Sequence, residues 1–134
     1  MYKQKVEIIE QVEHYHSKVR ELYQSLYGKV EDQNIKTLLD ELCMQEKLRE
    51  EYLGKHKESA KAMNNWLRYS TNKISNYIFE CFKNIKVKTE ISLDDVTKIE
   101  FHFNNCLVKL NKILSIEEKQ WEYYKQFFLY DEKF

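Results

Sequence analysis

Proline is missing from this sequence, and its 134 residues include only two glycines. These are the two residues that disfavour a helix interior most strongly. Their scarcity, together with the abundance of Leu, Lys, Glu and Ile, predicts an all-α fold. A chain of this length can bury one substantial core, so we expect a single domain over residues 1–134.

Charge of one sign is also lacking, because 22 Lys and Arg residues balance 22 Asp and Glu residues. A protein that binds nucleic acid or a membrane surface through a basic patch would show an excess of positive charge. No stretch approaches the length that spans a bilayer, and the first residues carry charges rather than an apolar signal core. We therefore expect a soluble protein without a nucleic-acid or membrane partner.

Only three cysteines occur, and they are far apart: Cys43, Cys81 and Cys106. Each lies within an apolar helical pattern, and their number is odd. Such spacing favours reduced, buried thiols over disulfides or a zinc cluster. A cytoplasmic location is the expectation that follows.

The pattern of apolar residues predicts two long helices at the start, over residues 2–27 and about 32–57. Gly28 suits a helix end, and the short acidic segment after it offers capping side chains. Because the connection is short, the two helices should be antiparallel neighbours. A longer connection, residues 58–92, should follow and contain a short helix over about 74–85.

Two possible capping boxes divide the rest of the chain. Ser92 and Asp95 should begin a third long helix, and Ser115 with Glu118 should end it near Leu114 and begin a fourth. This arrangement is an antiparallel four-helix bundle with a long crossover between helices two and three, the topology of ferritin-like bundles.

The second helix has a defect in its apolar face. Positions 35, 38, 39, 42, 46, 49, 53 and 56 follow the spacing of one helical face, but Glu46 and Arg49 occupy two of them. Charges inside a bundle occur mainly in pairs, because an unpaired buried charge is costly. We therefore expect Glu46 and Arg49 to form a buried ion pair, completed by hydrogen bonds from His16 or a tyrosine. The expected buried polar cluster comprises His16, Tyr23, Glu46 and Arg49.

The sequence resembles the ferritin-like superfamily, and its first two helices most resemble degenerate, rubrerythrin-like bacterial members. The matching segments are residues 16–26, 35–49, 65–70 and 92–96. Active members of that superfamily hold two metal ions with a Glu from each of two helices and a Glu-x-x-His pair from each of the others. The resemblance places His16 where a ligand glutamate is expected, and Glu46 and Arg49 where Glu-x-x-His is expected.

Two functions remain open at this point. The first is a bundle that has lost its di-metal centre and acts as a structural or protein-interaction module without a cofactor, because a guanidinium does not bind metal. The second is a di-iron or di-manganese oxidase, peroxidase or metal-binding protein with an atypical ligand set, whose candidates are His16, Glu46, Glu100, Glu117 and Glu118. Whether the protein is an enzyme therefore stays open, with the non-enzymatic reading preferred.

The end of the chain is rich in aromatic residues, between Trp121 and Phe134. Such residues can seal one end of a bundle or form a contact surface. A protein partner or self-association through this segment is the prediction that follows.

Overall fold

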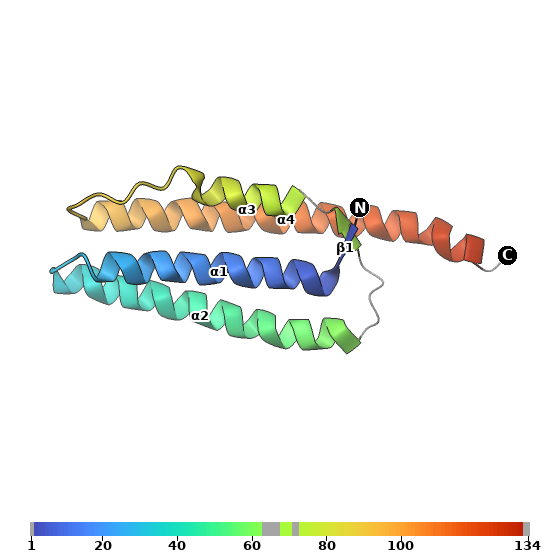
Figure 1. Ribbon diagram of the computed structural model, residues 1–134, viewed down its shortest axis with the longest axis horizontal. Helices are drawn as coiled ribbons and strands as arrows, with labels where there is room; N and C mark the ends of the chain where they lie inside the picture. Colours follow the sequence, from blue (N-terminus) through green and yellow to red (C-terminus); the bar gives the residue numbers. More distant parts are fainter. Residues whose placement is uncertain (1, 63–67, 71–72, 133–134) are drawn as a thin grey trace.

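The structure is a computed structural model that describes residues 2–62, 68–70 and 73–132, with side chains described for residues 6–57, 73–116 and 119. Within these ranges the chain is almost entirely helical, which confirms the predicted all-α class. The helices are α1 (Lys5–Tyr27), α2 (Gln33–Ala62), α3 (Lys73–Lys83) and α4 (Leu93–Glu132). Figure 1 shows α1 between α2 on one side and the α3–α4 hairpin on the other.

The first hairpin forms at the predicted turn. The amide of Gly28 donates to the carbonyl of Gln24 at the end of α1. At the start of α2, Asp32 Oδ1 accepts hydrogen bonds from the amides of Asn34 (2.8 Å) and Ile35 (3.2 Å), as an N-cap residue does. The helix α2 then continues to Ala62, beyond the predicted end near Lys57.

The helix α4 also begins where the sequence predicts. Ser92 Oγ accepts a hydrogen bond from the amide of Asp95, and Asp95 Oδ2 accepts one from the amide of Ser92. These two reciprocal bonds form a capping box. The short helix α3 lies beside α4, and the segment between them returns the chain along the bundle (Figure 1).

The predicted break near Leu114 was wrong, because α4 is one continuous helix of 40 residues. Ser115 lies inside it, and the helix continues as far as Glu132. The segment contains neither Gly nor Pro, so nothing in its backbone chemistry requires an end there. The sequence predicts a hairpin of two long helices that meet near Leu114. In the structure the second hairpin instead consists of the short helix α3 and the single long helix α4.

A second correction concerns the ends of the elements. Residues Tyr2–Gln4 form a strand, β1, rather than the first turn of a helix. It pairs antiparallel with β2 (Arg68–Ser70), with Lys3 opposite Tyr69.

The side chains of the aromatic segment Trp121–Phe134 lie outside the described part of the chain, and so do residues 133–134 altogether.

The core lies between α1 and the two groups of helices that flank it. Tyr15, on α1, donates a 2.8 Å hydrogen bond to the carbonyl of Phe103 on α4, which ties the two hairpins together. The largest fully buried side chains are Tyr15, Val19, Tyr23, Leu26, Leu39, Ile74, Val96 and Leu110.

None of the helices in the described part of the chain combines the length and the apolar character that a membrane span needs.

Candidate functional site

Three of the predicted site residues meet between α1 and α2. His16 Nδ1 lies 2.5 Å from Glu46 Oε2, and Arg49 Nη1 donates to Glu46 Oε1 at 2.6 Å. His16 and Glu46 are only 3% and 5% exposed. Both carboxylate oxygens of Glu46 are therefore engaged by nitrogen atoms. We call these three residues the Glu46 cluster.

The cluster forms because Glu46 belongs to the buried face of α2. Ile35, Leu39 and Leu42 precede it on that face and are buried in the core. An isolated carboxylate there would lose its hydration, at a cost of several kcal/mol. His16, on the facing helix, and Arg49, one turn further along α2, supply the compensating contacts. Arg49 reaches solvent, because its side chain is 38% exposed.

Tyr23 lies in the core near this cluster. Its ring packs edge to face on Phe103, with 6.4 Å between ring centroids. Burial raises the pKa of the Tyr23 hydroxyl above its ordinary value, and the carboxylates of Glu46 and Glu100 raise it further. Tyr23 is therefore a neutral hydroxyl at physiological pH. Glu100, another of the predicted metal ligands, is a half-buried residue of α4.

The remaining predicted metal ligands, Glu117 and Glu118, lie in α4, but their side chains are outside the described part of the structure. Among the residues whose side chains are described, no group of three or more His, Cys, Asp or Glu residues is arranged to hold a metal ion. The structure thus brings together His16 and Glu46, with Arg49 beside them rather than a third ligand.

Two ion pairs between α1 and α2 were not predicted from the sequence. Arg20 Nε lies 2.9 Å from Glu50 Oε2, and Arg20 Nη2 donates to Glu50 Oε1 at 3.3 Å. In the second pair, Lys57 Nζ lies 3.1 Å from Glu13 Oε1. The two residues on each helix are seven positions apart, so each pair of charges lies on one helix face. The seven-residue spacing of charged residues on both helices could therefore have predicted these two ion pairs from the sequence. These pairs fix the register of the two helices at which His16 faces Glu46.

A groove opens beside the Glu46 cluster, between α2 and α4. Its volume is about 360 Å³, and Arg49 and His16 form part of its wall. The other lining residues are mostly apolar: Val12, Leu48, Tyr52, Leu53, Leu107 and Asn111. The groove is thus an apolar surface feature with one cation at its edge.

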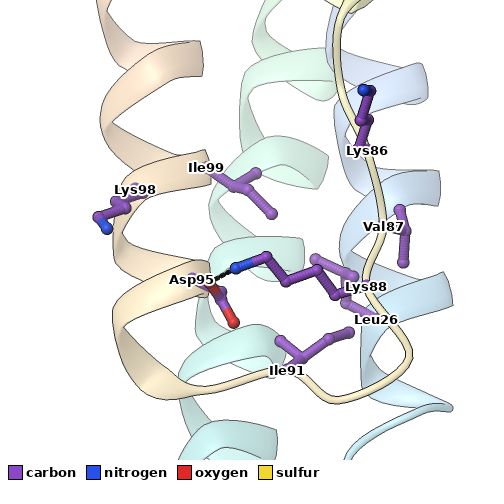
Figure 2. A pocket seen from close by; sticks show the side chains of 8 residues that line it. All are labelled: Leu26, Lys86, Val87, Lys88, Ile91, Asp95, Lys98 and Ile99. Atoms are coloured by element: carbon purple, nitrogen blue, oxygen red, sulfur yellow. Dashed lines mark hydrogen bonds and ion pairs between the residues drawn. The ribbon is translucent and has the colours of Figure 1, made fainter.

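A second hollow, of about 230 Å³, lies at the other end of the bundle, where the segment before α4 passes Leu26 (Figure 2). Lysines surround it, but two of them are already paired with acids of α4. Lys88 Nζ lies 3.2 Å from Asp95 Oδ1, and Lys98 Nζ lies 2.9 Å from Asp94 Oδ2. The hollow therefore offers little unpaired charge to a ligand.

The cysteines are free thiols, as expected. Cys81 on α3 and Cys106 on α4 are buried, while Cys43 is half-buried. His102 links the two buried cysteines, since its Nε2 lies 2.8 Å from the carbonyl of Cys81 and 3.6 Å from Cys106 Sγ. Burial is the largest cause that raises the pKa of the Cys81 thiol, and a hydrogen bond with Cys106 is the second. Together they raise this pKa to about 12. At neutral pH this thiol is protonated and a poor nucleophile.

Comparisons with protein-family models, with curated proteins and with solved structures found no match to this chain.

Proposed function

We propose that this protein is a non-catalytic helical bundle that acts as a structural or protein-interaction module, with an ion cluster where related bundles hold two metal ions. The observation that carries the proposal is the occupation of both Glu46 oxygens, by His16 Nδ1 and by Arg49 Nη1. A metal ion would compete with both contacts. It would also face the permanent positive charge of Arg49, which repels cations.

Part of the proposal is a distant relationship to ferritin-like bundles. It is supported by the long antiparallel α1–α2 hairpin and by the positions of His16 and Glu46 on the facing sides of these helices. The continuous helix α4 departs from the four long helices of that fold. The related part is accordingly the first hairpin, and the second half of the chain has a different arrangement.

The competing function is a di-metal enzyme that uses His16, Glu46 and Glu100 with Glu117 or Glu118. It requires Arg49 to leave Glu46 when metal binds. The Arg49 side chain is 38% exposed, so such a movement is sterically open to it. A guanidinium does not coordinate metal, so position 49 would still supply no ligand, and the residues present therefore fit a di-metal centre poorly.

Elemental analysis separates the two functions. The chain is purified from cells grown with iron and manganese supplied, and its metal content is measured per chain alongside a Glu46→Gln variant. Our proposal expects no stoichiometric metal in either protein. Two metal ions per wild-type chain that are lost in the Glu46→Gln variant would overturn it.

A further inference from the structure

The outward face of α2 carries three large apolar side chains. Met44, Leu48 and Tyr52 are 54%, 56% and 62% exposed. They are spaced by four residues, so they form one stripe along the helix. Single exposed apolar residues are common on protein surfaces, but an aligned group on one face marks a contact surface. The groove lined by Leu48, Tyr52, Leu53 and Leu107 extends this apolar area towards α4.

Opposite charges lie at the two ends of the stripe. Glu41 and Lys55 are each seven residues from Leu48, which places them on the same face, about 10.5 Å to either side along the helix. Both residues are exposed. Neither has an ion pair or a side-chain hydrogen bond within the described part of the chain, although other charges of α2, such as Glu50 and Lys57, do. The face is therefore self-complementary: its acidic end matches its basic end when one copy is reversed.

We infer that a second copy of this chain covers this face, with the two α2 helices antiparallel across a two-fold axis at Leu48. This inference rests on the proposed interaction role and names the partner. In this arrangement Leu48 meets Leu48 of the partner subunit, and Met44 meets Tyr52 of the partner subunit. Glu41 then pairs with Lys55 of the partner subunit, and the two-fold axis generates the same pair again.

The direction of pairing follows from the charges. A parallel arrangement would place Glu41 beside the partner's Glu41 and Lys55 beside the partner's Lys55, and both contacts are repulsive. The antiparallel arrangement replaces them with two attractions. On the flank of the stripe it brings Gln45 beside Glu51 of the partner subunit, which adds no like-charge contact.

Sedimentation equilibrium of the full chain, over micromolar to near-millimolar concentrations, tests the inference. Wild-type protein should form a dimer, and Leu48→Glu should raise its dissociation constant by at least about tenfold, because two buried carboxylates would face each other. Val108→Glu is the matched control, since Val108 is similarly exposed but lies on α4. It should leave the dimer intact. Circular dichroism checks that each variant keeps its helical content.

A charge exchange tests the antiparallel arrangement itself. Glu41→Lys alone and Lys55→Glu alone should each weaken the dimer by about tenfold, because each turns two attractions into two repulsions. The double variant carrying both changes restores the attractions, so its dissociation constant should return to near the wild-type value. If the double variant is as weak as the single ones, the proposed pairing is wrong.

The outcomes distinguish this inference from the proposed function. A monomer at every concentration, or a dimer that Leu48→Glu leaves unchanged, overturns the inference and leaves the metal question untouched. A dimer that depends on Leu48 but contains two metal ions per chain overturns the non-catalytic proposal and supports the interface. A dimer unaffected by Leu48→Glu would instead favour contact through the aromatic segment Trp121–Phe134.

Discussion

Glu46 Oε2 lies 2.5 Å from His16 Nδ1, and both side chains are more than nine-tenths buried. This contact, rather than the one with Arg49, is the fully buried half of the cluster. It joins α1 to α2 across 30 positions of sequence. The stability of the first hairpin should therefore depend on keeping both partners or replacing both.

The first prediction concerns this pair. His16→Leu alone leaves Glu46 short of one of its two partners, and we expect a loss of about 3 kcal/mol in the free energy of unfolding. The double variant His16→Leu with Glu46→Leu removes the buried charge as well and should cost much less than the two single changes added together. Chemical denaturation of the four proteins gives the coupling energy. Strict additivity would show that the contact contributes no coupling.

Arg49 should matter less for stability. Its side chain is 38% exposed, so water screens its interaction with Glu46. We expect Arg49→Met to lower the free energy of unfolding by about 1 kcal/mol, the upper end for a surface ion pair. The sequence predicts Arg49 within a buried cluster, whereas the structure leaves its side chain partly exposed. A loss as large as that of His16→Leu would mean that Arg49 is the main partner of Glu46.

Tyr15 provides a second test of the packing. Tyr15→Phe keeps the ring but removes the 2.8 Å hydrogen bond to the carbonyl of Phe103, which retains its backbone partner within α4. A typical intramolecular hydrogen bond contributes about 0.5–1.5 kcal/mol, and we expect a loss in this range by chemical denaturation. Tyr27→Phe is the control, because the Tyr27 ring contacts Lys36 Nζ through its face and the variant retains that ring. Equal effects of the two changes would refute a specific role for the Tyr15 hydrogen bond.

The capping box of α4 should make stability depend on pH. Hydrogen bonds from the amide and hydroxyl of Ser92, with the ammonium of Lys88 nearby, lower the pKa of the half-buried Asp95 carboxyl. A lowered folded-state pKa contributes stability above the unfolded-state pKa, and this contribution is lost as the pH falls through the folded-state value. Melting temperatures measured from neutral pH to below about pH 4 should therefore fall more steeply for wild type than for Asp95→Asn. Glu90→Gln, in the exposed segment before α4, should behave like wild type; identical curves for wild type and Asp95→Asn would contradict the prediction.

The three thiols should react in a fixed order. In folded protein at slightly alkaline pH, a thiol reagent should modify the half-buried Cys43 first. Cys81 should react only when the protein opens, because burial raises its pKa to about 12. Cys106 is buried as well and should follow the same slow phase. The variant Cys43→Ser should lose the fast phase. A fast phase that persists in that variant would show that a buried thiol is accessible.

The sequence predicted most of the helices because their signals are local. Apolar spacing gives the inward faces of α1 and α2, and the caps at Asp32 and Ser92 mark two helix starts correctly. The same kind of signal failed at Ser115, since a Ser followed three residues later by an acid is also compatible with a helix interior. A pattern that lacks Gly or Pro cannot by itself decide whether a helix ends.

The candidate site was predictable in its members but not in its geometry. Two polar residues on an apolar face point to Glu46 and Arg49, and the resemblance to ferritin-like bundles points to His16. Which partner is buried depends on how the helices are rotated, and that follows from tertiary contacts such as the Arg20–Glu50 pair. The pairing of β1 with β2 was likewise not predictable, because it joins three-residue segments more than 60 positions apart.

The central claim, that His16 and Arg49 take the place of metal ions at Glu46, is tested most directly by thermal unfolding with and without manganese or ferrous iron under anaerobic conditions. A metal bound at 100 times its dissociation constant would add about 2.7 kcal/mol to the free energy of unfolding. We predict no saturable rise in Tm with either metal. A saturable rise in wild type that disappears in Glu46→Gln would contradict the account.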